Sequence, residues 1–204
     1  MGRLIAAAVL LALPAAPAIA QPAALDQIRA RLEAHAVVRA EFVQTRTMAA
    51  LQRPQVSRGQ LLVSRSEGAV WRMDEPYPVT YVLRQDSVVE IAADGTRTRR
   101  DVREAPAVAR IGRIMSALVM ADSAALGNDF QIDATIAGDR WHIVLAPRQA
   151  SIAQRLKAVR VSGREFVDSV QVEETGGDAT RLQFRNHRGG ATLSEDERRL
   201  FADE

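Results

Sequence analysis

The feature that most constrains the fold is a succession of short strand-like runs, each followed by a turn signal. Apolar and polar residues alternate in these runs, as between Phe130 and Thr135, and glycine, proline or aspartate residues separate them. Such tight connections join antiparallel neighbours. The predicted strands cover residues 38–47, 57–65, 69–75, 78–84, 87–92, 96–102, 129–136, 140–146, 156–162, 166–174 and 179–186.

An antiparallel sheet of about eleven strands is too long to stay open and flat, so we expect it to curl. Two stretches have helical periodicity: residues 25 to about 36, and an unusually apolar segment from Pro106 to about 120. They are the elements available to cover the concave side. The predicted fold is therefore mainly β with α: an incomplete antiparallel β-barrel with helices across its concave side.

Apolar side chains of the predicted strands and of the second helix face this concave side. A packed core and a lined apolar cavity produce the same pattern, so the residues alone leave both interpretations open. The tryptophans likewise suit core anchors. The candidate cavity residues are Phe42, Leu61, Val63, Trp71, Met73, Ile111, Ile114, Met115 and Leu118.

Arg65 ends the otherwise apolar face formed by Gly59, Leu61 and Val63. A guanidinium cannot lose its charge, so Arg65 must either extend into solvent at the rim or find acceptors inside the protein. The pattern does not decide between these positions.

The N-terminus predicts secretion. Arg3 precedes an apolar run from Leu4 to Ile19 that contains two prolines, and small residues lead to a cleavage site after Ala20. We expect a signal peptide at residues 1–20 and one periplasmic domain at residues 21–204. The chain has no cysteine, which excludes disulfides and N-terminal lipidation of the mature protein. Its charges are nearly balanced, with 27 basic and 25 acidic residues, which does not favour nucleic-acid binding.

Motifs for catalysis are absent from the sequence. It contains no Gly-x-Ser-x-Gly, no His-Glu-x-x-His and no glycine-rich phosphate loop. The three histidines, His35, His142 and His187, lie far apart and have no local partners at metal-ligand spacing. We therefore expect no enzyme activity, metal or cofactor. A hydrolase would need a site assembled from distant residues.

Several motifs, in order along the chain, resemble those of the LolA family, periplasmic carriers of outer-membrane lipoproteins, and especially its LolA-like branch. The resemblance covers essentially all of residues 21–204. The motifs are Phe42-x-Gln44, Gly59-x-Leu61-x-Val63-x-Arg65, Trp71 followed by Pro76, Leu145-x-Pro147 and Phe184-x-Asn186.

The resemblance implies a monomeric carrier whose hydrophobic cavity binds the acyl chains of a lipoprotein or another lipid. It implies that Arg65 latches a helical lid through backbone carbonyls when the cavity is empty. It also implies an inner-membrane ABC-type exporter and an outer-membrane acceptor as partners. A carrier of a glycolipid or acyl metabolite fits the same motifs. A fully packed binding module is the other alternative.

Overall fold

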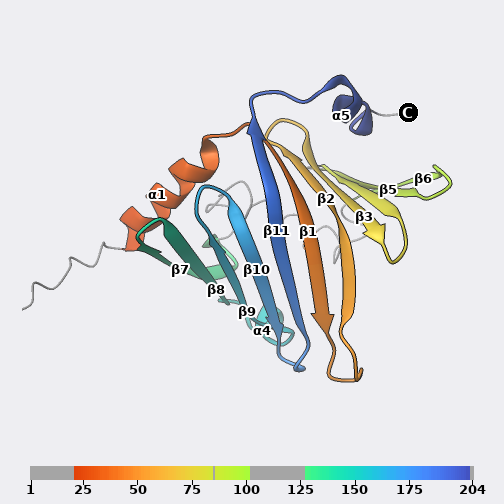
Figure 1. Cartoon of the computed structure of the whole chain (residues 1–204). Helices are drawn as coiled ribbons and strands as arrows, with labels where there is room; N and C mark the ends of the chain where they lie inside the picture. Colours follow the sequence, from red (N-terminus) through yellow and green to blue (C-terminus); the bar gives the residue numbers. More distant parts are fainter. Residues whose placement is uncertain (1–20, 85, 102–126, 203–204) are drawn as a thin grey trace, which may run out of the picture.

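The computed structural model describes residues 21–84, 86–101 and 127–202, which form one eleven-stranded antiparallel sheet and three helices (Figure 1). The strands are β1 Val37–Thr47, β2 Gln55–Ser64, β3 Gly68–Glu75, β4 Val79–Leu83, β5 Ser87–Ala92, β6 Arg97–Asp101, β7 Phe130–Ala137, β8 Arg140–Pro147, β9 Leu156–Gly163, β10 Val167–Glu174 and β11 Ala179–Gly190. The helices are α1 Gln21–Glu33, α4 Ala150–Ala153 and α5 Glu195–Leu200.

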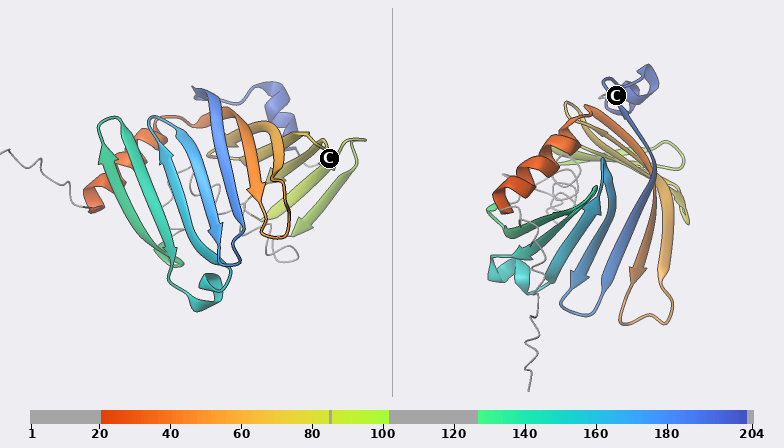
Figure 2. Two further views of the ribbon diagram at one scale, coloured as in Figure 1. Left: turned by 60° about the horizontal axis from the view of Figure 1, so that its bottom comes forward. Right: turned by 60° about the vertical axis from the view of Figure 1, so that its left-hand side comes forward.

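Two meanders make up the sheet, which has the order β6-β5-β4-β3-β2-β1-β11-β10-β9-β8-β7. β1 pairs with both β2 and β11, so the first strand of the chain lies at the centre. β6 and β7 are the two ends, and the sheet curls without closing into a barrel (Figure 2). The structure thus confirms the predicted incomplete antiparallel barrel.

Helix α1 lies across the concave side of the curled sheet (Figure 2). Its face carrying Ala24, Ile28 and Leu32 is buried in the main apolar cluster, together with side chains of β1, β2 and β7–β11. The second predicted helix, with Ile111, Ile114, Met115 and Leu118, lies outside the described residues, as does the predicted signal peptide. None of the helices in the described part of the chain is long and apolar enough to cross a membrane.

The end of the first helix differs from the prediction. α1 ends at Glu33, whereas the apolar periodicity extended it to about Ala36. Ala36 is exposed, and its carbonyl accepts a hydrogen bond from the Arg65 backbone N–H at 3.0 Å. The chain therefore leaves the helix early because it must turn to begin β1 at Val37.

A second, smaller apolar cluster covers part of the convex side. Leu62 of β2 and Val70 of β3 are buried there with neighbouring valines, against Leu193 and Phe201 from the C-terminal residues 193–202. We call residues 193–202 the strap. The strap contains α5 and docks on the sheet (Figure 1).

Candidate functional site

The concave face brings together the predicted strand residues of the cavity. Phe42, Leu61 and Val63 are buried, and Trp71 and Met73 pack half-buried against the same cluster. The rings of Phe42 and Trp71 lie 4.1 Å apart between centroids and are tilted by 32°. This arrangement gives the concave side an apolar surface built by β1, β2 and β3.

Phe184 of β11 extends this aromatic group. It is paired with Phe42 across the β1–β11 ladder, and its ring meets Trp71 edge-on with centroids 6.4 Å apart. The sequence indicated Phe184 only as part of a motif, because the alternation along β11 does not show that its partner strand is β1.

Gly59 makes this packing possible. A Cβ atom on Gly59 would lie 1.9 Å from the backbone oxygen of Arg72 and 2.9 Å from the ring of Phe42. Because real Cβ atoms do not approach other heavy atoms so closely, only glycine fits without a shift of β3 or the ring.

Arg65 lies at the rim and binds the C-terminal end of α1. Its Nη2 donates to the carbonyl of Leu32 at 2.9 Å, and its Nε donates to the carbonyl of His35 at 3.2 Å. The last carbonyls of a helix have no partner within the helix and carry partial negative charge. Arg65 therefore joins the end of β2 to the end of α1. Its acceptors are backbone carbonyls, which are present whatever side chains occupy these positions. We call this set of bonds the latch.

Two histidines that are distant in sequence meet beside the latch. The ring of Phe166, in the β9–β10 turn, is stacked between His35 and His187, with 5.0 Å between centroids on each side. His35 Nε2 is also 3.0 Å from Glu165 Oε1. Below the stack, a pocket of only about 20 Å³ remains between Leu32 and the sheet, so this end of the concave side is closed.

No sequence signal brought these rings together, because their neighbourhood depends on the pairing of β1 with β11 and on the position of a turn. Among the described residues, no group of histidine and carboxylate side chains could hold a metal ion.

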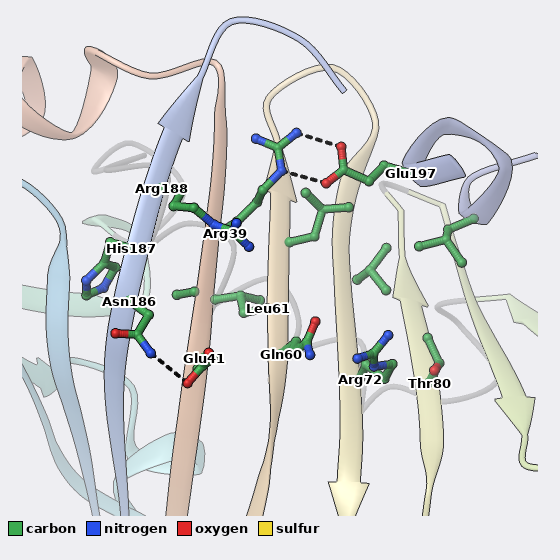
Figure 3. A pocket seen from close by; sticks show the side chains of 14 residues that line it. Arg39, Glu41, Gln60, Leu61, Arg72, Thr80, Asn186, His187, Arg188 and Glu197 are labelled. Atoms are coloured by element: carbon green, nitrogen blue, oxygen red, sulfur yellow. Dashed lines mark hydrogen bonds and ion pairs between the residues drawn. The ribbon is translucent and has the colours of Figure 1, made fainter. Parts of the chain in front are cut away.

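A larger hollow of about 550 Å³ lies on the convex side next to α5 (Figure 3). Arg39 of β1 donates to both carboxylate oxygens of Glu197 there, at 2.5 and 2.6 Å. This bidentate bond is the main reason that the pKa of Glu197 falls from 4.5 to about 2, against the opposing effect of partial burial. The same bond raises the pKa of Arg39.

Comparison with known proteins gives a family but no near relative. The family model of outer membrane lipoprotein carrier protein LolA-like proteins matches residues 15–192. No curated protein matches the chain by sequence.

Solved structures with a similar course of the chain share little sequence with it. A LolA superfamily protein from Nitrosomonas europaea is 10% identical with a TM-score of 0.49, over 91% of this chain and 99% of that chain. The matching chain in the complex of MucA and MucB from Pseudomonas aeruginosa is 12% identical with a TM-score of 0.46, over 88% of this chain and 59% of that chain. Lipoprotein LppX from Mycobacterium tuberculosis is 12% identical with a TM-score of 0.45, over 86% of this chain and 100% of that chain. With a family match over residues 15–192, the chain belongs to the family of LolA-like outer membrane lipoprotein carrier proteins.

Proposed function

We propose that this protein carries the acyl chains of a lipoprotein, or of another lipid, through the periplasm from the inner to the outer membrane. The observation that carries the proposal is the latch: a charged side chain at the rim of an apolar concave face binds backbone carbonyls in and just after the last turn of the helix lying across that face. A purely structural core needs no such contact, since α1 already buries Ile28 and Leu32.

The energies are consistent with a lid that cargo can move. Hydrogen bonds from a charged donor contribute about 1.5–3 kcal/mol each when sheltered, and less where water competes, as at the exposed Arg65. Each acyl methylene transferred from water contributes about 0.8 kcal/mol. A few methylenes therefore offset the latch, and a whole acyl chain exceeds it. The latch lowers net affinity for cargo and so favours release.

The remaining features of this proposal follow the family. Residues 1–20 serve as a signal peptide cleaved after Ala20, and residues 21–204 form one monomeric carrier domain in the periplasm. The family is described as a carrier, and we propose that this chain has no enzymatic activity or cofactor of its own. An inner-membrane ABC-type exporter would load it and an outer-membrane acceptor would unload it.

The direct test is to purify the protein from cell envelopes under native conditions and identify bound lipid by mass spectrometry. The proposal predicts copurifying acylated molecules, and the mass identifies a lipoprotein, a glycolipid or an acyl metabolite. Protein that is always empty and that also rejects added palmitate would refute the carrier function. Turnover of an acyl ester, lost when His35 or His187 is replaced, would instead support a hydrolase.

A further inference from the structure

The concave face becomes polar toward its β6 end. The strand registers place Leu61 of β2, Trp71 of β3, Tyr81 of β4, Glu90 of β5 and Thr98 of β6 in one row, each opposite the next. Directly paired residues of antiparallel strands point to the same face, so the whole row shares the concave side with Trp71 and the main apolar cluster. The first two side chains of the row are apolar, and the last three are polar.

Arg100 adds a positive charge to this end of the face. It lies two residues after Thr98 on β6 and therefore points to the same side. We call Tyr81, Glu90, Thr98 and Arg100 the polar patch. Tyr81 and Glu90 are half-buried, whereas Thr98 and Arg100 are exposed. The polar patch thus extends from the apolar concave surface outward to β6, the last strand at this end of the sheet.

Two opposite charges act on the Tyr81 hydroxyl group. Burial raises the pKa of Tyr81, the carboxylate of Glu90 raises it further, and the guanidinium of Arg100 lowers it. Both charges therefore lie near the hydroxyl group, because more distant charges are screened by solvent and salt. The polar patch combines one acidic group, one basic group and two hydroxyl groups.

The groups of the polar patch are not paired with one another. Within residues 21–84, 86–101 and 127–202, none of the four side chains forms a hydrogen bond or ion pair. Val88, which points to the same side of β5 as Glu90, is buried, so Glu90 does not belong to an ordinary polar surface. A lipid on the concave face would displace water from Tyr81 and Glu90. Because polar groups that lose water without gaining a partner are costly, the cargo must supply the partners.

The charges of the polar patch restrict the head group of such a lipid. An anionic head group would pair with Arg100 but be repelled by Glu90, and a cationic head group would do the reverse. An uncharged head group would leave both side chains without a counter-charge. A zwitterionic head group satisfies both, because a phosphate accepts hydrogen bonds from a guanidinium and an ammonium donates them to a carboxylate. The ring of Tyr81 favours the ammonium further.

We propose that the polar patch binds the zwitterionic head group of a phosphatidylethanolamine-type lipid whose acyl chains lie on the apolar surface beside Trp71. The phosphate contacts Arg100 and Thr98. The ammonium contacts Glu90 beside Tyr81. Trp71 and Tyr81 are paired directly, with about 5 Å between their Cβ atoms, so one lipid molecule reaches both surfaces. This inference rests on the proposed carrier function and specifies its cargo.

The test compares short-chain phosphatidylethanolamine with short-chain phosphatidylglycerol, each carrying one fluorescent acyl chain. The two lipids share the phosphate and differ in the ammonium, and fluorescence anisotropy measures their binding to the purified protein. We expect the unaltered protein to bind phosphatidylethanolamine at least about threefold more tightly. Glu90→Gln should abolish this preference, whereas Arg100→Gln should weaken binding of both lipids at least about threefold. Arg99→Gln, on the convex face of β6, is the matched control and should change neither.

Equal affinity of the unaltered protein for both phospholipids would overturn the inference. A preference that survives Glu90→Gln, or equal losses with Arg99→Gln and Arg100→Gln, would overturn it as well. Displacement of the bound lipid by glycerophosphoethanolamine, which has the head group without acyl chains, would identify a soluble ligand and contradict the lipid assignment.

Fluorescent palmitate separates this inference from the carrier function. Palmitate has acyl carbons but no zwitterionic head group, so its binding depends on the concave face and not on the polar patch. Protein that binds palmitate without distinguishing the two phospholipids would refute this inference and leave the carrier function standing. Protein that binds none of the three would refute both.

Discussion

Two arginines secure the two faces of the sheet in chemically different ways. On the concave side, Arg65 is exposed and donates to two neutral backbone carbonyls, that of Leu32 in the last turn of α1 and that of His35 just beyond it. On the convex side, Arg39 is largely sheltered and grips both oxygens of Glu197. Ser194 and Glu197 also cap α5 reciprocally, which ties the same carboxylate to the helix start.

The difference bears on which of the two contacts can open in the proposed carrier function. A charged pair with two short bonds in a sheltered place is stronger and more specific than bonds from an exposed guanidinium to neutral carbonyls. We therefore expect the strap to stay bound to the sheet, and the contact of α1 with Arg65 to open more easily. The following predictions test this contrast, from the largest expected effect to the smallest.

The apolar clusters of the two faces should differ in strength. Phe42→Ala removes a fully buried ring at the centre of the larger cluster and should lower the free energy of unfolding by about 3–5 kcal/mol. Leu62→Ala leaves a cavity in the smaller cluster that the strap can partly fill by shifting toward the sheet. It should lower the free energy of unfolding by about 2 kcal/mol. Urea denaturation measures both. A larger loss of unfolding free energy for Leu62→Ala than for Phe42→Ala would show that the convex cluster contributes more to stability than the concave one.

Gly59→Ala tests the close approach of β3 and Phe42. Because the added methyl group meets a backbone oxygen that cannot rotate away, we expect a loss of about 2 kcal/mol. Gly176→Ala is the matched control: no atom lies within 4 Å of its Cβ position, so its effect should stay within about 0.5 kcal/mol. Equal stability of the two variants would show that Gly59 is not constrained by packing.

The bond between Arg39 and Glu197 predicts a pH dependence. The pKa of Glu197 in the folded protein, about 2, lies below the ordinary 4.5, so the stabilisation is complete above about pH 4.5 and is lost as the pH falls through about 2. Glu197→Gln should therefore cost about 1–2 kcal/mol at pH 7, and this cost should shrink steadily as the pH falls from 4.5 through 2. Urea midpoints of both proteins across this range measure it. A difference that is constant with pH would mean that the charge of Glu197 is not what holds the strap.

Much of the arrangement on the concave side could be predicted from the sequence. Alternation fixes which side chains of a strand share a face, so the grouping of Phe42, Leu61, Val63, Trp71 and Met73 followed from the sequence. The need of Arg65 for acceptors also followed, because its charge is permanent. Which carbonyls it binds could not be predicted, since this depends on α1 ending at Glu33 and the chain turning there.

Which side chains become neighbours on the convex side could not be predicted from the sequence. Glu41, Gln60, Arg72 and Thr80 lie side by side on the convex side only through the registers of three strand pairs, which the pattern of a single strand does not encode. The few apolar residues of the strap form no stripe at helical spacing, so the sequence does not indicate that it docks on the sheet. The partner of Glu197 lies 158 positions away in sequence.

The measurement that tests the central claim most directly is the release of a fluorescent fatty acid from the unaltered protein, Arg65→Leu and Arg58→Leu. Arg58 lies on β2, the strand that ends just before Arg65, but it bonds Glu75 at the exposed surface, so its variant controls for loss of charge. We predict slower release and about three- to tenfold tighter binding for Arg65→Leu alone, the equivalent of about 1 kcal/mol of lost latch energy. Identical release by all three proteins would contradict the latch.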